Sequence, residues 1–225
     1  MIKPNILYED NHILVVEKPE NVLSQEDKTK DIDMLSLLKD YIKEKYNKPG
    51  NVYLGLVHRL DRPVGGVMVF AKTSKAASRL SEQIKKNEIE KTYIAVVKDI
   101  GIDDEGEFVD HLEKGPNGIS AVSKKGKLSK LSYQVLERVD DKALVRIKLQ
   151  TGRHHQIRVQ FSSRGFYICG DQRYGKEDKT QIALFAYRLV FRHPVTKNMM
   201  EFELLPVEKG HWTGLTLSKN VKKKK

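Results

Sequence analysis

Short apolar segments joined by brief turns place the main constraint on how this chain of 225 residues can fold. Residues 6–8 and 13–18 have the composition of strands and flank a turn at Asp10-Asn11, and Pro19 ends the second strand. Further strands are predicted at residues 67–71, 93–97, 145–149, 182–191 and 199–204, and helices at residues 33–45, 74–86 and 153–163. Because strands and helices do not alternate regularly, we expect an α+β fold: a mixed, largely antiparallel sheet with flanking helices.

Domain organisation follows from the absence of an internal linker or repeat. The chain length suits one domain, or two small halves that share a core. We expect a single catalytic domain over residues 1–218, followed by a basic tail, residues 219–225, predicted to be disordered. Residues 99–130 are rich in Gly, Asp and Lys, and we expect turns and exposed hairpins there.

The N-terminus and the cysteine content exclude several classes of protein. No apolar run approaches the ~20 residues of a membrane span, and the first residues lack the apolar stretch of a secretory signal. The single cysteine, Cys169, cannot form an internal disulfide or a Cys-rich zinc site. These features predict a cytoplasmic protein with no membrane partner.

Charge points to a polyanionic partner. Lys and Arg number 41 against 30 Asp and Glu, a net charge of +11, and the chain remains basic without its tail lysines. A basic protein favours nucleic acid over a membrane surface as its partner. A solvated, lysine-rich surface is the alternative.

Two segments, residues 58–62 and 152–158, concentrate the side chains that can carry chemistry. In the helix expected at 153–163, His154 and Arg158 would share one face. Adjacent histidines also suggest a metal, but His154, His155 and one cysteine do not have a zinc-ligand spacing, so we expect no metal.

Four ordered motifs identify the chain as similar to the RluA-type pseudouridine synthases, without the additional N-terminal RNA-binding module. They are HRLDRPVGGVMVFAKT at residues 58–73, KTYIAVV at 91–97, LQTGRHHQIRVQ at 149–160 and GDQRYG at 170–175. The resemblance implies a pseudouridine synthase fold with a central catalytic cleft and an enzyme that isomerises uridine in RNA without a cofactor.

By this resemblance Asp61 is the catalytic aspartate, a nucleophile or general base that must be ionised at neutral pH. Arg158 matches the arginine of the family's HQIR stretch, and we expect its guanidinium to pair with Asp61 and lower the pKa of that carboxyl. The alternative for Asp61 is a structural salt-bridge or turn residue.

Base flipping supplies roles for two more residues. Arg59 resembles the family residue that replaces the flipped base in the stack, with a phosphate contact as its alternative. Tyr93 resembles the active-site tyrosine and would stack on the flipped uracil, worth roughly 1–3 kcal/mol, with a core tyrosine as its alternative.

The remaining residues expected to bind RNA surround these positions. They are His58, Arg62, Arg153, His154, His155 and Gln156, and His58 would also brace its loop. Arg153, Arg164 and Arg173 would form part of a phosphate track, with a solvated face as the equal alternative.

Two departures from the family pattern affect substrate choice and loop geometry. Val64-Gly65 stands where many members have Thr-Ser, and Phe185 stands where many have His. A non-catalytic RNA-binding protein on the same scaffold is therefore the main alternative, and an Asp-nucleophile hydrolase is weaker because a second carboxylate is lacking. Ribosomal and transfer RNA are equally open as substrates, and we expect a monomer.

Overall fold

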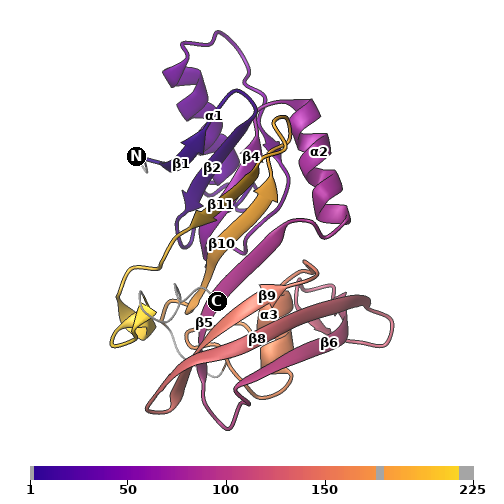
Figure 1. The fold of residues 1–225 in the computed structure, drawn as a ribbon, viewed down its shortest axis with the longest axis vertical. Coiled ribbons are helices and arrows are strands. Elements are labelled where there is room, and N and C mark those ends of the chain that lie inside the picture. The colour runs from indigo at the N-terminus through magenta and orange to yellow at the C-terminus, as the bar shows by residue number, and fades with distance from the viewer. Residues whose placement is uncertain (1–2, 176–179, 218–225) are drawn as a thin grey trace. The chain divides into compact units, whose positions relative to one another are not determined.

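The computed structural model describes residues 3–175 and 180–217, which form two compact units. The first unit comprises residues 3–89 and 188–204, and the second comprises residues 90–175, 180–187 and 205–217. Figure 1 shows the helices and strands of each. The predicted basic tail, residues 219–225, lies outside the described residues.

The first unit is built on antiparallel strand pairs. Its strands are β1 (Asn5–Glu9), β2 (Ile13–Lys18), β3 (Gly55–Leu56), β4 (Gly65–Ala71), the end of β10 (Leu184–Arg192) and β11 (Met199–Glu203). β2 pairs with β1 and β4, β3 pairs with β4, and β10 pairs with β11. The predicted turn after β1 is confirmed, because Oδ1 of Asp10 accepts from the backbone N–H groups of His12 and Ile13 at 2.7 and 2.8 Å.

Both helices of the first unit begin at a residue whose side chain caps the helix. In α1 (Met34–Lys45), Asp33 accepts from the backbone N–H of Ser36 at 3.0 Å. In α2 (Ser74–Lys85), Thr73 accepts from the backbone N–H of Ala76 at 3.1 Å. Each side chain satisfies one of the N–H groups that a helix start leaves without a partner.

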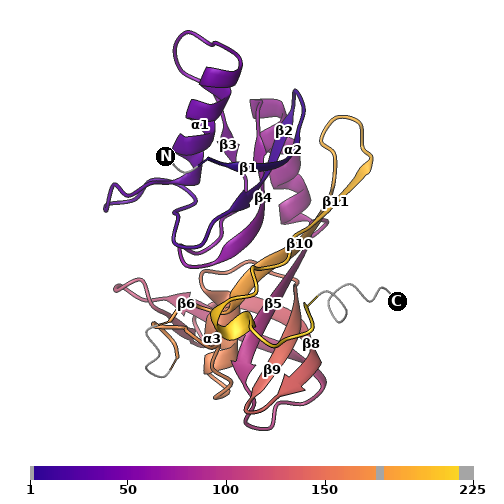
Figure 2. The same ribbon diagram turned by 90° about the vertical axis from the view of Figure 1, so that its left-hand side faces the viewer.

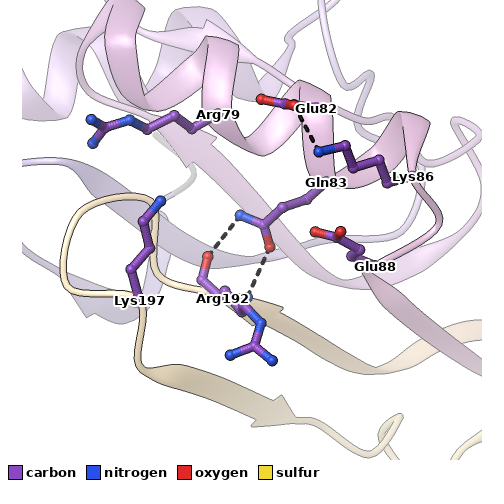
Figure 3. A pocket seen from close by; sticks show the side chains of 7 residues that line it. All are labelled: Arg79, Glu82, Gln83, Lys86, Glu88, Arg192 and Lys197. Atoms are coloured by element: carbon purple, nitrogen blue, oxygen red, sulfur yellow. Dashed lines mark hydrogen bonds and ion pairs between the residues drawn. The ribbon is translucent and has the colours of Figure 1, made fainter.

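Helix α2 packs on the strands through its apolar side. Ala76 and Leu80 lie in a buried cluster with residues of β2, β4 and β10, namely Ile13, Val15, Val67, Val69, Ala71, Leu189 and Phe191. Gln83 lies on the same buried side of α2, one turn further along, and both of its amide atoms bond the backbone of Arg192 at 2.9 Å (Figure 3). The helix and the hairpin are therefore joined by apolar packing and by the two hydrogen bonds of the Gln83 amide.

Within the second unit, the strands of the sheet follow one another in the order β5-β9-β8-β6-β7, and each neighbouring pair is antiparallel. Figure 2 labels β5, β6, β8 and β9. The strands are β5 (Glu90–Lys98), β6 (Glu105–Lys114), β7 (Ser120–Val122), β8 (Lys127–Val139) and β9 (Lys142–Leu149). The hairpins expected within residues 99–130 are confirmed as β6, β7 and the start of β8.

Helix α3 (Gln156–Ser162) covers part of this sheet. Its Phe161 lies edge-on to Phe108 of β6 and Tyr133 of β8, with ring centroids 5.0 and 5.7 Å away. The expected start at residue 153 is wrong. His155 has a φ of 53°, in the left-handed region, so a right-handed helix cannot run through it and α3 begins at Gln156. His154 therefore precedes the helix and does not share a helical face with Arg158.

Together these elements confirm an α+β fold with a mixed, largely antiparallel sheet and flanking helices. An isolated parallel bridge joins Leu23 and Asp33, while the strand pairs described above are antiparallel. No helix among the described residues is long and apolar enough to span a membrane.

Candidate active site

Asp61 lies in the loop between β3 and β4, in the first unit. The loop turns tightly after it, because the backbone N–H of Val64 donates to the carbonyl of Asp61 at 3.0 Å. Leu60 and Val64 on either side are buried, whereas Asp61 is partly exposed. The two apolar neighbours anchor the loop and leave the carboxylate at the surface. Here the backbone supplies a hydrogen bond that closes the turn, and the valine side chain is part of the core.

Two side chains brace this loop from below. His58 accepts a hydrogen bond at Nε2 from the backbone N–H of Val69 at 3.1 Å, so its ring is tied to β4. The hydroxyl of buried Ser24 bonds both backbone groups of Leu60, donating at 2.8 Å and accepting at 3.1 Å. The bracing role expected for His58 fits this geometry, and Ser24 was not among the predicted site residues.

Lys18 is a second residue that the sequence did not single out. Its side chain is fully buried, and Nζ donates to the carbonyl oxygens of Pro19, Val22 and Arg62 at 2.9, 2.6 and 3.0 Å. Burial lowers the pKa of Lys18 to about 7, and the nearby charge of Asp61 opposes that shift. One signal in the sequence could have indicated Lys18: it is a lysine at the end of an apolar strand, directly before a proline.

Arg59 and Arg62 lie on either side of Asp61 and are both exposed. Arg62 forms an ion pair with Asp31 at 2.8 Å, in which both side chains are 46% exposed. Such exposed pairs contribute little to stability, so the arginine can exchange this partner for another anion. Exposure of Arg59 suits either of its predicted roles, base replacement or phosphate contact.

Tyr93 and Arg158 belong to the second unit. Tyr93 is on β5, paired in register with Ile147 of β9, and is 9% exposed. Arg158 is on α3 and is 5% exposed. Its guanidinium binds Asp171 through two hydrogen bonds, Nε to Oδ2 at 2.8 Å and Nη2 to Oδ1 at 2.7 Å.

Asp171 is the centre of a small polar turn. Its Oδ1 also accepts from the backbone N–H groups of Arg173 and Tyr174 at 2.9 and 3.1 Å. Burial alone would raise the pKa of Asp171, but the hydrogen bonds and charge of Arg158 and these backbone groups lower it overall. The aspartate is therefore held as a carboxylate and fixes the plane of the arginine.

Tyr174 joins this pair to the two histidines. Its ring lies 5.1 Å from the guanidinium carbon of Arg158, and its hydroxyl lies 2.7 Å from Nδ1 of His155. The hydroxyl also accepts from the backbone N–H of Ser120 at 2.8 Å, and the Ser120 side chain lies 2.8 Å from Nδ1 of His154. The histidine rings stack 3.7 Å apart, so both are fixed by protein contacts.

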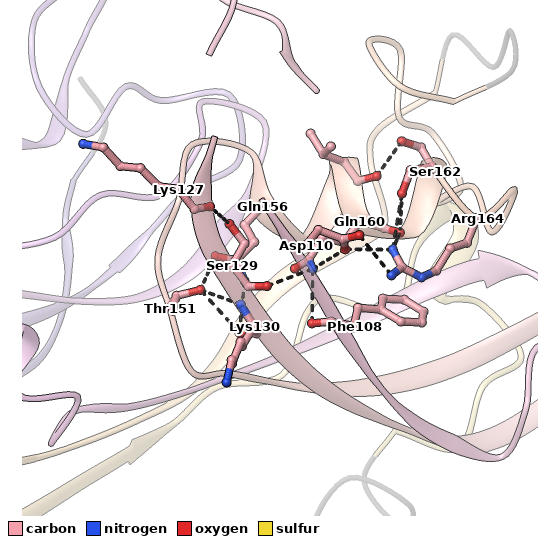
Figure 4. A network of polar contacts seen from close by, with 12 residues as sticks. Phe108, Asp110, Lys127, Ser129, Lys130, Thr151, Gln156, Gln160, Ser162 and Arg164 are labelled. Carbon is pink, nitrogen blue, oxygen red and sulfur yellow. Dashed lines mark hydrogen bonds and ion pairs between the residues drawn. The ribbon is translucent and has the colours of Figure 1, made fainter. Parts of the chain in front are cut away.

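Gln156 has a structural position in the second unit. It is 3% exposed, and its amide bonds Thr151 Oγ1 and the carbonyl of Lys130 at 2.8 and 3.0 Å (Figure 4). The amide oxygen also accepts from the backbone N–H of Arg153 at 3.0 Å. These contacts shape the turn before α3. Direct RNA contact by Gln156 remains a prediction, and its geometry favours bracing.

The arginines of the expected phosphate track also bond to the protein. Arg153 donates to the carbonyl of Leu128 at 3.0 Å, and Arg173 donates to that of Gly118 at 3.0 Å. Arg164 pairs with Asp110 at 2.9 Å and stacks on Phe108, as Figure 4 shows for the polar contacts. Asp110 neutralises Arg164, which makes that residue the weakest candidate of the three for phosphate binding.

Comparison with known proteins places this arrangement in a family. A model of the RNA pseudouridylate synthase family matches residues 12–163, a span that contains Asp61, Tyr93 and Arg158. The chain belongs to this family. The match confirms the resemblance predicted from the four motifs.

Several curated members of the family are similar to the chain. An uncharacterised RNA pseudouridine synthase of Aquifex aeolicus is 35% identical over 216 residues, covering 89% of this chain and 68% of its own length. The ribosomal large subunit pseudouridine synthase D of Pseudomonas aeruginosa is 37% identical over 179 residues, covering 77% of this chain and 54% of its own. Synthase C of Escherichia coli is 32% identical over 227 residues, covering 91% and 67%. The chain thus spans about half to two thirds of the length of these relatives.

Solved structures share the fold. The human RNA pseudouridylate synthase domain containing 4 superimposes with a TM-score of 0.76 at 22% identity, covering 90% of this chain and 89% of that one. Human RNA pseudouridylate synthase domain containing 1 gives a TM-score of 0.73 at 23% identity, covering 90% and 83%.

Proposed function

We propose that this protein is an RNA pseudouridine synthase that isomerises specific uridines in ribosomal or transfer RNA. The observation that carries the proposal is the family match over residues 12–163. The names of the similar ribosomal large subunit synthases favour ribosomal RNA. Because the family match includes residues of both compact units, we propose that residues 1–218 act as one catalytic domain, a cytoplasmic monomer in this proposal.

The reaction exchanges one bond of the nucleoside for another. The glycosidic bond between N1 and C1′ breaks, the uracil turns, and C5 bonds to C1′. The hydrogen on C5 is then lost, and N1 carries a proton in the product, so atoms balance without a cofactor. Asp61 acts as nucleophile or general base, and either role requires its carboxylate form.

Arg158 is proposed as the partner of Asp61. A guanidinium has five N–H donors in one plane, enough to bind two carboxylates along different edges. Asp171 fixes that plane through two hydrogen bonds, so Arg158 would meet Asp61 with a preset direction. The pairing would place a cation beside the carboxylate that the reaction uses.

Base flipping assigns the other residues. Extruding a uridine from folded RNA costs a few kcal/mol. In our proposal Arg59 fills the vacated place in the stack and Tyr93 stacks on the extruded uracil. His58, Arg62, Arg153, His154, His155 and Gln156 contact the RNA or hold the loops that do so.

Release of the C5 hydrogen provides the test. Transcribed RNA carrying tritium at C5 of uridine should release tritium to water with wild-type protein and not with Asp61→Asn, which keeps the size of the side chain. Asp40→Asn, at an exposed carboxylate of α1, is the matched control and should be fully active. Wild-type activity in Asp61→Asn would refute the assignment of Asp61.

Mapping pseudouridine in cells identifies the substrate. Total RNA from cells lacking the protein should miss one or more sites, which wild type restores and Asp61→Asn does not. If Asp61→Asn also restores the sites, or if purified wild-type protein binds RNA and releases no tritium, the non-catalytic RNA-binding alternative replaces our proposal.

A further inference from the structure

A charged hollow lies on the first unit, between α2 and the β10–β11 hairpin (Figure 3). Its volume is about 160 Å³, and it is lined by Arg79, Glu82, Gln83, Lys86, Glu88, Arg192 and Lys197. Four of these side chains are cationic and two are carboxylates, so the lining has an excess of positive charge. None of the seven belongs to the four motifs at residues 58–73, 91–97, 149–160 and 170–175.

The walls of the hollow are fixed by hydrogen bonds. Gln83 clamps the backbone of Arg192, and Arg79 donates to the carbonyl of Pro194 at 2.9 Å. Buried His193 holds the turn that follows, since its ring bonds Oδ2 of Asp10 and the backbone N–H of Thr196 at 2.8 and 2.9 Å. A ligand would therefore meet cations on a prearranged scaffold, which lowers the entropy cost of binding.

The positive charges of the hollow are unevenly compensated. Lys86 pairs with Glu82 at 2.9 Å. The guanidinium of Arg192 has no hydrogen-bond or ion-pair partner within residues 3–175 and 180–217. Among the described residues, Nζ of Lys197 has one hydrogen bond, a long contact of 3.4 Å to the carbonyl of Pro194, and its charge also acts on Glu82. Glu82 itself forms its ion pair with Lys86, so within the described residues neither Arg192 nor Lys197 forms an ion pair, an arrangement that attracts an anion.

We propose that this hollow is an accessory site for a backbone phosphate of the RNA substrate, with Arg192 and Lys197 as its main contacts. The inference rests on the proposed function, because RNA is the polyanion that the family modifies. Phosphate contacts set the register of a nucleic acid on a protein and carry no sequence information. The site would strengthen binding and align the RNA without taking part in the reaction.

Salt dependence of RNA binding gives the decisive readout. Each phosphate contact releases condensed counterions, so the slope of log K against log salt changes by about 0.7 for single strands and about 0.9 for duplexes. In the double variant Arg192→Gln/Lys197→Gln, we expect the slope of log K against log salt to become shallower by about the amount for one phosphate contact. Its kcat at saturating RNA should equal that of wild type, with KM raised.

The matched control is Lys43→Gln/Lys48→Gln, which removes two exposed lysines at the end of α1. It changes the net charge equally without touching the hollow. A slope in the Arg192/Lys197 variant equal to that of this control would overturn the proposal. Failure of wild type to bind RNA with a salt-dependent affinity would instead contradict the proposed function.

A variant expected to bind RNA more tightly gives a test that a folding defect cannot imitate. Glu88→Gln removes a carboxylate from the lining, so it should bind RNA more tightly than wild type and with a steeper salt slope. Unchanged binding in this variant would count against the site. If the double variant loses binding of inorganic phosphate but keeps the wild-type RNA slope, the hollow is a small-anion site and our proposal is wrong.

Discussion

Arg158 and Asp171 bind each other edge to edge inside the second unit, through two hydrogen bonds of 2.8 and 2.7 Å. Their side chains are only 6% and 1% exposed. The arginine predicted to serve the catalytic aspartate is thus positioned by another aspartate, 13 residues further along the chain. The residue proposed to pair with Asp61 is therefore distinct from the residue that holds it in place.

We predict that Asp171→Asn lowers the free energy of unfolding by about 3 kcal/mol, because it leaves a buried guanidinium without its counter-charge. It should also lower kcat more than it raises KM, since Arg158 would lose its direction. Urea unfolding and tritium release measure the two effects. The same substitution at Asp141, an exposed ion pair with Lys98, should change neither quantity.

The pH dependence of stability should show the contribution of Glu9. Burial alone would raise its pKa, but hydrogen bonds from Lys45, Lys72 and two tyrosines lower it to about 2. A carboxyl whose pKa is lower in the folded state stabilises the protein above its unfolded pKa, ~4.3, and loses that contribution as pH falls to about 2. Unfolding of Glu9→Gln should therefore depend less on pH between about 4.3 and 2 than that of wild type. Equal pH profiles would contradict this.

Lys18→Met should destabilise the fold and slow the reaction. Methionine keeps the length of the side chain but cannot donate to the carbonyls of Pro19, Val22 and Arg62, and buried acceptors without donors cost about 1–3 kcal/mol. Loss of the bond to Arg62 loosens the residue next to Asp61, so kcat should fall. Denaturant unfolding and turnover assays test both effects, with Lys43→Met as the exposed control.

The ring and the hydroxyl of Tyr174 should have separable effects. Tyr174→Phe keeps the ring against Arg158 but removes the bonds to His155 and Ser120, so stability should fall by about 1 kcal/mol with activity largely retained. Tyr174→Ala removes both and should reduce kcat as well. Equal turnover in the two variants would show that the ring does not position the arginine.

The parts of the fold that could be predicted depend on local signals. The turn at Asp10, the caps Asp33 and Thr73, and the apolar spacing of α1 and α2 are each encoded within a few residues. The start of α3 was predicted wrongly because its limits depend on a left-handed His155 and on the amide of Gln156, which bonds the N–H of Arg153. Helical spacing alone does not reveal such a turn.

The candidate site was predictable from motifs but its supports were not. Asp61, Tyr93 and Arg158 stand within recognisable stretches of sequence. Ser24 lies 36 residues from its partner Leu60, and Lys18 lies 44 residues from Arg62. Contacts over such separations arise only when the chain has folded, so side-chain spacing gives no indication of them.

Helix α3 has only seven residues, far fewer than the ~12 that an isolated helix needs to be even marginally stable in water. Its order depends on the packing of its own Phe161 against Phe108 and Tyr133, and on the bond of its Arg158 to Asp171. A growing polypeptide that has reached residue 165 already contains the whole HHQIR segment but has no carboxylate to fix Arg158. During synthesis, then, the chain should pass through a stage at which Asp61, Tyr93 and Arg158 are all present while Arg158 is not yet held by Asp171.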